Sequence, residues 1–279
     1  MSEASLYYLP ALRRLGRFNV ELLHVEEPDA EARPDAPWGV EPYLEEKASA
    51  LREATGLEVR VAHPRGIPYA VVLAEAERPD VAMVLTTTRG RGGLERWRMG
   101  SVADKVIRGA PCPVFVVGPS SRGAPPAFER ILVPLDGSKL AEEALPVAKL
   151  LAEALGATLR LVRAVTPRTV PDELAGSVTA DVIESYELVA EEYLQEARLE
   201  LETRQPVEVR VVLGPGAEVI LTEVREAPCD LVVMTSHGRH GFVRFALGSV
   251  TERVLAASAA PVLVLKPGHW ERFRLFQAT

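Results

Sequence analysis

The sequence predicts an α/β protein built from two repeated, doubly wound parallel-sheet domains. The segment 90–101 recurs 148 residues later as 238–249, and each copy begins with glycine and ends in Gly-Ser. Each copy is followed by a helical pattern and then by a Pro-led apolar strand, at 113–117 and 261–265. A repeat of about 150 residues is too long for a solenoid unit and has the size of a domain. Strands that alternate with helices predict a parallel sheet with right-handed crossovers.

The repeat and the composition together divide the 279 residues into four parts. We expect a first domain at 1–118, a linker rich in Gly, Pro and Ser at 119–128, a second domain at 129–268 and a C-terminal tail at 269–279. Aromatic residues recur every third position in the tail, at Trp270, Phe273 and Phe276. This spacing predicts a short helix that packs on its own protein, with a partner-binding tail as the alternative.

The second half shows the element order most clearly. A short apolar strand at 130–135 leads into Asp136-Gly137-Ser138, where Ser138 is expected to cap a helix that runs to Leu155 and stops at Gly156. The remaining strands are expected at 158–165, 207–213, 230–234 and 261–265, with helices at 179–203, at 216–226 and from 249. The strand at 230–234 does not alternate, which is typical of a strand buried on both faces. The expected strand order is 3-2-1-4-5.

The first half repeats this order without its first strand. It starts with a helix near Ser2, and its strands are expected at 20–25, 57–62, 81–86 and 113–117. The missing counterpart of 131–137 would lie between the second and fourth strands, where its absence leaves backbone groups without partners. We therefore expect either that the natural chain starts upstream or that this half is distorted.

Composition excludes several classes of function. The net charge of −7 argues against a dedicated nucleic-acid binder, which needs a broad basic face. The two cysteines, Cys112 and Cys229, have no CxxC spacing and are expected to be free and buried. No signal peptide and no apolar run of about 20 residues is present, so we expect a cytoplasmic protein without membrane contact.

Polar and glycine residues gather where the strands end. In a parallel sheet, ligands bind at the carboxyl ends of the strands, near the point where strand order reverses. Asp136 follows the first strand of the second half and Thr235 follows the fourth, and these strands are expected to be neighbours. Gly238 and Gly248 allow the backbone to approach an anion, and Ser249 opens a helix. The alternative is structural: the glycines permit a tight turn, and Asp136 caps the following helix.

Together these motifs resemble the universal stress protein family in its tandem, two-domain form. The residues that carry the resemblance are 133–138, 233–241, 247–251 and 260–264 in the second half, and 87–93 and 99–102 in the first. It covers the chain except the linker and the tail. It implies the Rossmann-like fold of adenine nucleotide alpha hydrolases and a bound adenine nucleotide, ATP foremost, with or without Mg²⁺.

The resemblance also implies a set of binding residues. In the second half these are Pro134, Leu135, Asp136, Ala164, Met234, Thr235, Gly238, Arg239, Gly248, Ser249, Val250 and Thr251. The first half, which lacks the aspartate, retains at best a partial site at Gly90, Arg91, Gly100, Ser101 and Val102. The chain departs from the family's G-x2-G-x9-G-[ST] pattern because the first glycine is Thr87 in one half and Thr235 in the other.

Catalytic signatures are missing. There is no G-x4-GK[ST], no G-x-S-x-G and no Cys/His pair, and His237 and His240 lack a third metal ligand, so no tightly held metal is expected. We therefore expect a stress-response protein that binds the nucleotide without turning it over. A regulatory or scaffold module that binds no nucleotide and a slow adenine-nucleotide hydrolase are the two alternatives.

The fifth strands, 114–117 and 262–265, are apolar edge strands, and such edges tend to pair. We expect them to pair within one chain as an internal pseudo-dimer, and the resemblance leaves further dimerisation and unidentified protein partners open.

Overall fold

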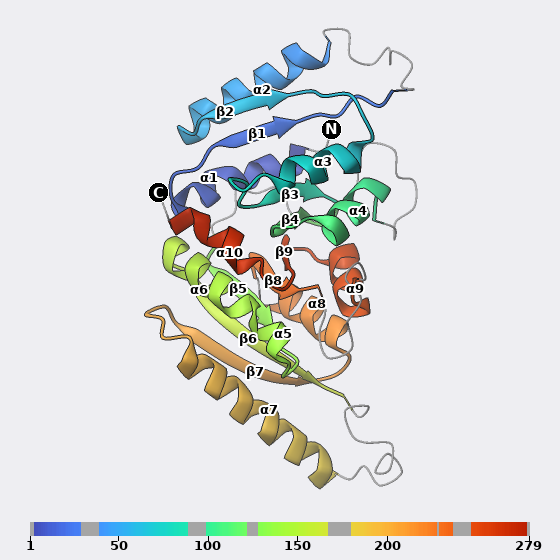
Figure 1. The fold of residues 1–279 in the computed structure, drawn as a ribbon. Helices are drawn as coiled ribbons and strands as arrows, with labels where there is room; N and C mark the ends of the chain where they lie inside the picture. The colour runs from blue at the N-terminus through green and yellow to red at the C-terminus, as the bar shows by residue number, and fades with distance from the viewer. Residues whose placement is uncertain are drawn as a thin grey trace.

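The computed structural model describes residues 3–28, 39–88, 99–121, 128–166, 180–227, 229–236 and 247–277. It is an α/β structure, as predicted, in which helices cover a central sheet (Figure 1). The strands of the second half are β5 (Arg130–Pro134), β6 (Thr158–Val165), β7 (Val207–Leu213), β8 (Leu231–Thr235) and β9 (Val262–Leu265). They are all parallel and lie side by side as β7-β6-β5-β8-β9, which is the expected order 3-2-1-4-5.

The helices of the second half begin and end largely where the sequence indicates. They are α5 (Lys139–Glu142), α6 (Ala144–Leu155), α7 (Ala180–Glu200), α8 (Gly216–Glu226) and α9 (Ser249–Ala257). Ser138 Oγ accepts a hydrogen bond of 3.1 Å from Ala141 N–H, so the expected cap of α5 is present. Gly156 ends α6 in the left-handed conformation, at φ 72°.

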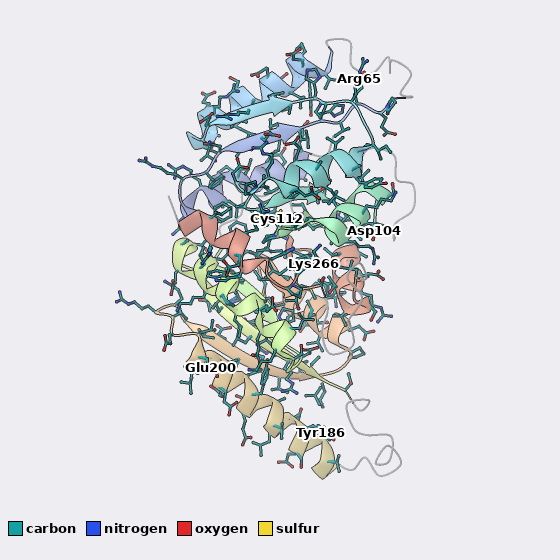
Figure 2. The ribbon with its side chains drawn as sticks, viewed as in Figure 1. Arg65, Asp104, Cys112, Tyr186, Glu200 and Lys266 are labelled. Carbon is teal, nitrogen blue, oxygen red and sulfur yellow. The ribbon has the colours of Figure 1, made fainter. Side chains whose placement is uncertain are left out.

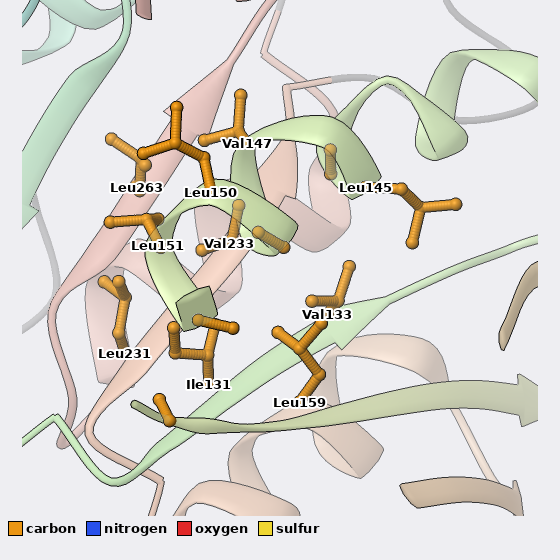
Figure 3. Packing of buried hydrophobic residues seen from close by; sticks show 14 of the residues in the cluster. Ile131, Val133, Leu145, Val147, Leu150, Leu151, Leu159, Leu231, Val233 and Leu263 are labelled. Carbon is orange, nitrogen blue, oxygen red and sulfur yellow. The ribbon is translucent and has the colours of Figure 1, made fainter. Parts of the chain in front are cut away.

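The core of the second half has two layers because β5 and β8 are covered on both faces. Ile131 and Val233 pack against Leu151 of α6 on one face (Figure 3). Leu132 and Val232 point to the other face, where they share a cluster with Ile220 of α8 and other residues. Side chains alternate along a strand, so a strand with apolar residues at every position fills both layers. Burial of each such side chain contributes about 1.5–3 kcal/mol.

The first half has the elements that the sequence predicts, but they fall into two sheets. Its strands are β1 (Val20–Leu23), β2 (Val59–Ala62), β3 (Val84–Thr87) and β4 (Val114–Val117). Its helical segments are the 3₁₀ helix η1 (Glu3–Tyr8), α1 (Leu9–Leu12), the 3₁₀ helix η2 (Arg13–Leu15), α2 (Val40–Thr55), α3 (Pro68–Glu77) and α4 (Ser101–Gly109). β1 and β2 form a parallel pair on their own, whereas β3 and β4 are part of the large sheet. The predicted interruption is thus confirmed: no counterpart of β5 stands between β1 and β3 in the described residues.

The two halves share one sheet of seven strands. β4 pairs antiparallel with β9, with Phe115 opposite Leu263, and the complete order is β3-β4-β9-β8-β5-β6-β7. Both strands are fully buried. The predicted pairing of the fifth strands within one chain is confirmed.

The tail packs on its own protein, as expected. It contains α10 (Trp270–Phe273) and a 3₁₀ turn (Arg274–Gln277). Phe273 is inaccessible to solvent, and its ring lies 5.2 Å from that of Phe276, which in turn lies 5.3 Å from the ring of Phe18 in the first half. Both cysteines are free and buried. Among the described helices, none combines the length and the apolar character needed to cross a bilayer.

Candidate functional site

Three strand ends of the second half bring predicted site residues to one edge of the sheet. Pro134 ends β5, and Leu135 continues the ladder through a 2.8 Å hydrogen bond from its N–H to the carbonyl oxygen of Val162 in β6. Ala164 lies one residue before the end of β6, and Met234 and Thr235 end β8. Since β5 lies between β6 and β8, these three ends are adjacent, as the sequence predicts.

Asp136 is held by the loop that follows β5. Its Oδ1 accepts hydrogen bonds from the N–H of Ser138 at 2.9 Å and from its hydroxyl at 2.6 Å. The cap of α5 is Ser138 and not Asp136, which was the structural alternative for that residue; Asp136 instead holds the capping serine. The carboxylate is half-buried at the strand end, where a ligand-binding role also requires it.

The glycine loop ends at a helix start that is anchored to β8. The N–H of Gly248 donates to the carbonyl of Ser236 at 2.8 Å, and the Thr251 hydroxyl lies 3.3 Å and 3.2 Å from the carbonyls of Thr235 and Ser236. Among the residues that the structure describes, no side chain caps α9 at Gly248, and Ser249 and Val250 are exposed. The uncapped amides at the start of a helix, with the positive end of its dipole, favour an anion.

A small apolar wall lies beside this helix start. A Cβ placed on Gly216 would meet Val250 Cγ2 at 3.7 Å and Ala164 Cβ at 4.0 Å, so the three residues converge from α8, α9 and β6. The sequence predicts Ala164 and Val250 as site residues but misses Gly216. The sequence does contain a signal for Gly216, because Gly214-Pro215-Gly216 connects β7 to α8 at the same edge of the sheet as the other site residues.

The first half repeats the helix start in atomic detail. The N–H of Gly100 donates to the carbonyl of Thr88 at 2.7 Å, and the backbone angles of Gly100 (φ −62°, ψ 144°) match those of Gly248 (φ −64°, ψ 146°). Ser101 and Val102 are exposed, like their counterparts Ser249 and Val250. Four predicted residues, Gly90, Arg91, Gly238 and Arg239, lie outside the described residues, as do His237 and His240.

The two threonines that replace the family's first glycine occupy the ends of β3 and β8. Thr87 pairs with Val117 and Thr235 with Leu265, so the two positions are equivalent in the repeat. Thr235 is 6% exposed, and thus its side chain is packed into the end of the sheet.

Ionic contacts link the two helix starts. Arg108 of α4 pairs with Asp104 at 2.8 Å and with Glu252 of α9 at 2.6 Å. Asp104 lies on the face of α4 seen in Figure 2, near the place where the halves meet. The arginine offsets acidic charge near the first turn of both helices, where a carboxylate would otherwise repel an anion.

A cavity of about 340 Å³ lies at the carboxyl ends of β1 and β2. It is lined in part by His24, Glu26, Glu41 and His63, and burial lowers the pKa of His24. Within the described ranges, no group of three His, Cys, Asp or Glu side chains is arranged to hold a metal ion. The cavity shares no residue with the site of the second half.

Comparison with known proteins identifies the family. The model of the universal stress protein family matches residues 9–118 and 127–266. A universal stress protein of Mycobacterium tuberculosis is 35% identical over 67% of this chain, and the match covers 62% of that relative, so the chain spans less than two thirds of its length. One from Mycolicibacterium smegmatis is 28% identical, with 95% of this chain and 90% of the relative covered.

A solved structure supports the fold. The crystal structure of a universal stress protein from Archaeoglobus fulgidus has a TM-score of 0.69 and 23% identity, and the match covers 95% of this chain and 94% of that one. The family match in both halves agrees with the repeat in the sequence and with the duplicated helix starts. The chain therefore belongs to the universal stress protein family, with two copies of the family's domain in tandem.

Proposed function

We propose that this chain binds an adenine nucleotide, ATP foremost, at the carboxyl ends of β5, β6 and β8, and acts by binding rather than by turnover. The adenine would lie against Ala164, Gly216 and Val250, and the phosphates would lie at the start of α9. Asp136 would accept a hydrogen bond from the ribose.

The observation that carries this proposal is the wall at Gly216. Gly216 has no side chain, and a Cβ placed on it would already touch both Val250 and Ala164, while α9 starts one residue before Val250. An apolar surface beside a bare helix start matches a molecule with a flat apolar ring at one end and phosphates at the other. Any Mg²⁺ would be held by the phosphates, as is usual for nucleotide-bound Mg²⁺.

Titration calorimetry with ATP tests the proposal. Gly216→Val fills the wall and is expected to weaken binding at least tenfold. Asp136→Asn keeps an oxygen for Ser138 but removes the charge, and is expected to weaken binding about tenfold, the size of one charge-assisted hydrogen bond. Circular dichroism and thermal unfolding verify that each variant is folded.

The first half offers a matched control. Pro68 is the first residue of α3, just as Gly216 is the first residue of α8. Two residues before each helix stands a glycine with positive φ, Gly66 or Gly214, and a Cβ on either glycine would meet the valine that lies five residues later in the chain. Pro68 is therefore the equivalent of Gly216 in the repeat. Pro68→Val should leave ATP binding unchanged. Undetectable binding of millimolar ATP to the wild type would refute the proposal.

A regulatory module that binds no nucleotide is the second candidate. Two observations favour it: Ser138 already occupies Oδ1 of Asp136, and Thr235 replaces the family's first glycine. The same titration separates the two candidates. Thr235→Gly would restore the first glycine of the family pattern. If this variant bound ATP and the wild type did not, the result would support a regulatory module that binds no nucleotide.

A further inference from the structure

The cavity at the carboxyl ends of β1 and β2 lies where parallel sheets bind their ligands. Its volume of about 340 Å³ falls in the usual range for small-molecule pockets, about 300–1,000 Å³. Residues that follow the two strands line it together with the first turn of α2, and Arg65 in Figure 2 marks this end of the strands. The cavity therefore has the place and the size of a ligand site.

The two strands hold a group of polar side chains on one face of their ladder. The pairing of β1 with β2 continues beyond the strands to a bridge between Glu26 and Arg65, without a change of register. In this register His24 is the partner of His63. Because alternate residues of a strand share a face, the two imidazoles and the Glu26–Arg65 ion pair of 2.8 Å lie on the same face, about 6.6 Å apart along the strands.

The second half has apolar residues at the places of these two imidazoles. Gly16 and Gly156 each follow a helical segment and have a positive φ, and His24 and Ala164 each stand eight residues later. The strand partner of Ala164 is Val212, so the second imidazole also stands where the other copy is apolar. The first half thus keeps the position of a ligand site but has a lining of different chemistry.

The lining favours a cation. Burial lowers the pKa of His24, so its imidazole is neutral at pH 7, and the ion pair with Arg65 lowers the pKa of Glu26. Glu41 of α2 is 72% exposed and lies 3.7 Å from Nε2 of His63, which is beyond hydrogen-bond range. No lysine or arginine is among the described residues that line the cavity. Two carboxylates and two imidazoles offer acceptors to a positively charged donor.

The rest of the lining is aliphatic. Val40 and Pro42 of α2 line the cavity beside Glu41, while Glu26 comes from the strand side. An aliphatic surface between two carboxylates on different elements matches a short chain of methylene groups with a cation at each end. Amines of this kind are charged at neutral pH, as the lysine side chain is.

We propose that this cavity is a binding site for a short aliphatic diamine. One ammonium group pairs with Glu41 and the other with Glu26, the imidazoles accept further hydrogen bonds, and the methylene groups lie against Val40 and Pro42. This inference does not depend on the nucleotide proposal, because the cavity shares no residue with the site of the second half.

Titration of the full chain with putrescine tests the proposal, with the histidine ring signals read by NMR. The titration is run without nucleotide, at constant ionic strength and with EDTA. Saturable shifts are expected for His24 and His63, whose signals are assigned with the variants His24→Gln and His63→Gln. The signal of His269, which is buried at a distant place in the tail, should stay unchanged and reports that the fold is intact.

A matched pair of variants on α2 separates the site from general charge effects. Glu41→Gln is expected to weaken binding at least tenfold, since it removes one charged partner. Glu46→Gln removes the same charge from the same helix, at a side chain that is 74% exposed and outside the cavity, and should bind as the wild type does.

Butanediol, which has the same chain length without charge, should cause no shift. Saturable shifts of His24 and His63 that are weakened in Glu41→Gln alone support the site. The proposal is overturned by the absence of such shifts at millimolar putrescine, by equal weakening in Glu41→Gln and Glu46→Gln, or by equal binding of butanediol.

Discussion

Arg108 Nη2 lies 2.6 Å from Glu252 Oε1, so a side chain of the first half forms an ion pair with the helix that starts at the candidate phosphate site of the second. Asp104 and Glu252 stand four residues after Gly100 and Gly248, at equivalent positions of the repeat. Arg108 thus forms ion pairs with both equivalent carboxylates, and these pairs connect the first turns of α4 and α9 across the junction of β4 and β9.

We predict that Arg108→Gln lowers the free energy of unfolding by about 1 kcal/mol, since the pairs are partly exposed and screened by solvent. It should also weaken ATP binding severalfold, because Glu252 is left unopposed near the start of α9. Urea denaturation and calorimetry measure the two effects. The control is Arg253→Gln, which removes an exposed arginine from α9, the helix that carries Glu252. Equal losses in both variants would show that net charge, not the ion pair, is responsible.

A buried ion pair on the other side of the second half gives a larger effect. Arg160 of β6 and Glu223 of α8 are 3.2 Å apart, with side chains 8% and 5% exposed. Glu223→Gln is expected to destabilise the chain by about 2 kcal/mol, because it leaves Arg160 with Glu208 as its charged partner in a poorly hydrated place. Glu208→Gln, where the side chain is 43% exposed, should cost less than half as much. Denaturant midpoints compare them, and the reverse ranking would contradict the argument.

The tail contributes to the stability of both halves. Phe273 is inaccessible, and through Phe276 it reaches Phe18. We expect Phe273→Ala to cost about 3–5 kcal/mol, the usual range for a buried phenyl ring. Leu199→Ala, at a side chain that is 76% exposed, should change stability by less than about 0.5 kcal/mol. A loss below about 1 kcal/mol for Phe273→Ala would mean that the tail is not part of the core.

The buried side chain of His269 is expected to make the free energy of unfolding depend on pH. Burial, aided by the positive charge of Lys266, lowers the pKa of His269 from 6.5 to about 3. Its Nδ1 is buried without a hydrogen-bond partner in the described residues. Between pH 6.5 and 3 the unfolded chain binds a proton that the folded chain does not. Stability is therefore lost as the pH falls from about 6.5 towards 3, by about 2 kcal/mol at pH 5.

Urea denaturation between pH 7 and 5 checks this expectation. His269→Gln should remove most of that slope, whereas His63→Gln, at a side chain that is 43% exposed, should retain it. An unchanged slope in His269→Gln would show that another group carries the acid sensitivity.

Several parts of the candidate site were predictable from the sequence. Asp136, Ala164, Thr235 and Ser249 were placed at strand ends and at a helix start, because the order of strands and helices carries that information. Gly216 was not, since its role arises only when α8 brings it beside Val250. The role of Asp136 was left open, because a strand-end aspartate followed by Gly-Ser fits a structural position and a ligand site equally well; the structure adds that its carboxylate accepts hydrogen bonds from Ser138.

The sequence by itself determined the duplication, the succession of strands and helices and the pairing of the fifth strands, because apolar periodicity, glycine and proline act on their immediate neighbours. Only the tertiary structure decided that β1 and β2 stand apart from β3, that one arginine joins α4 to α9, and that β3 is left half-buried. These features depend on contacts between residues far apart in the chain, and on which backbone groups find a partner once the strands are laid side by side.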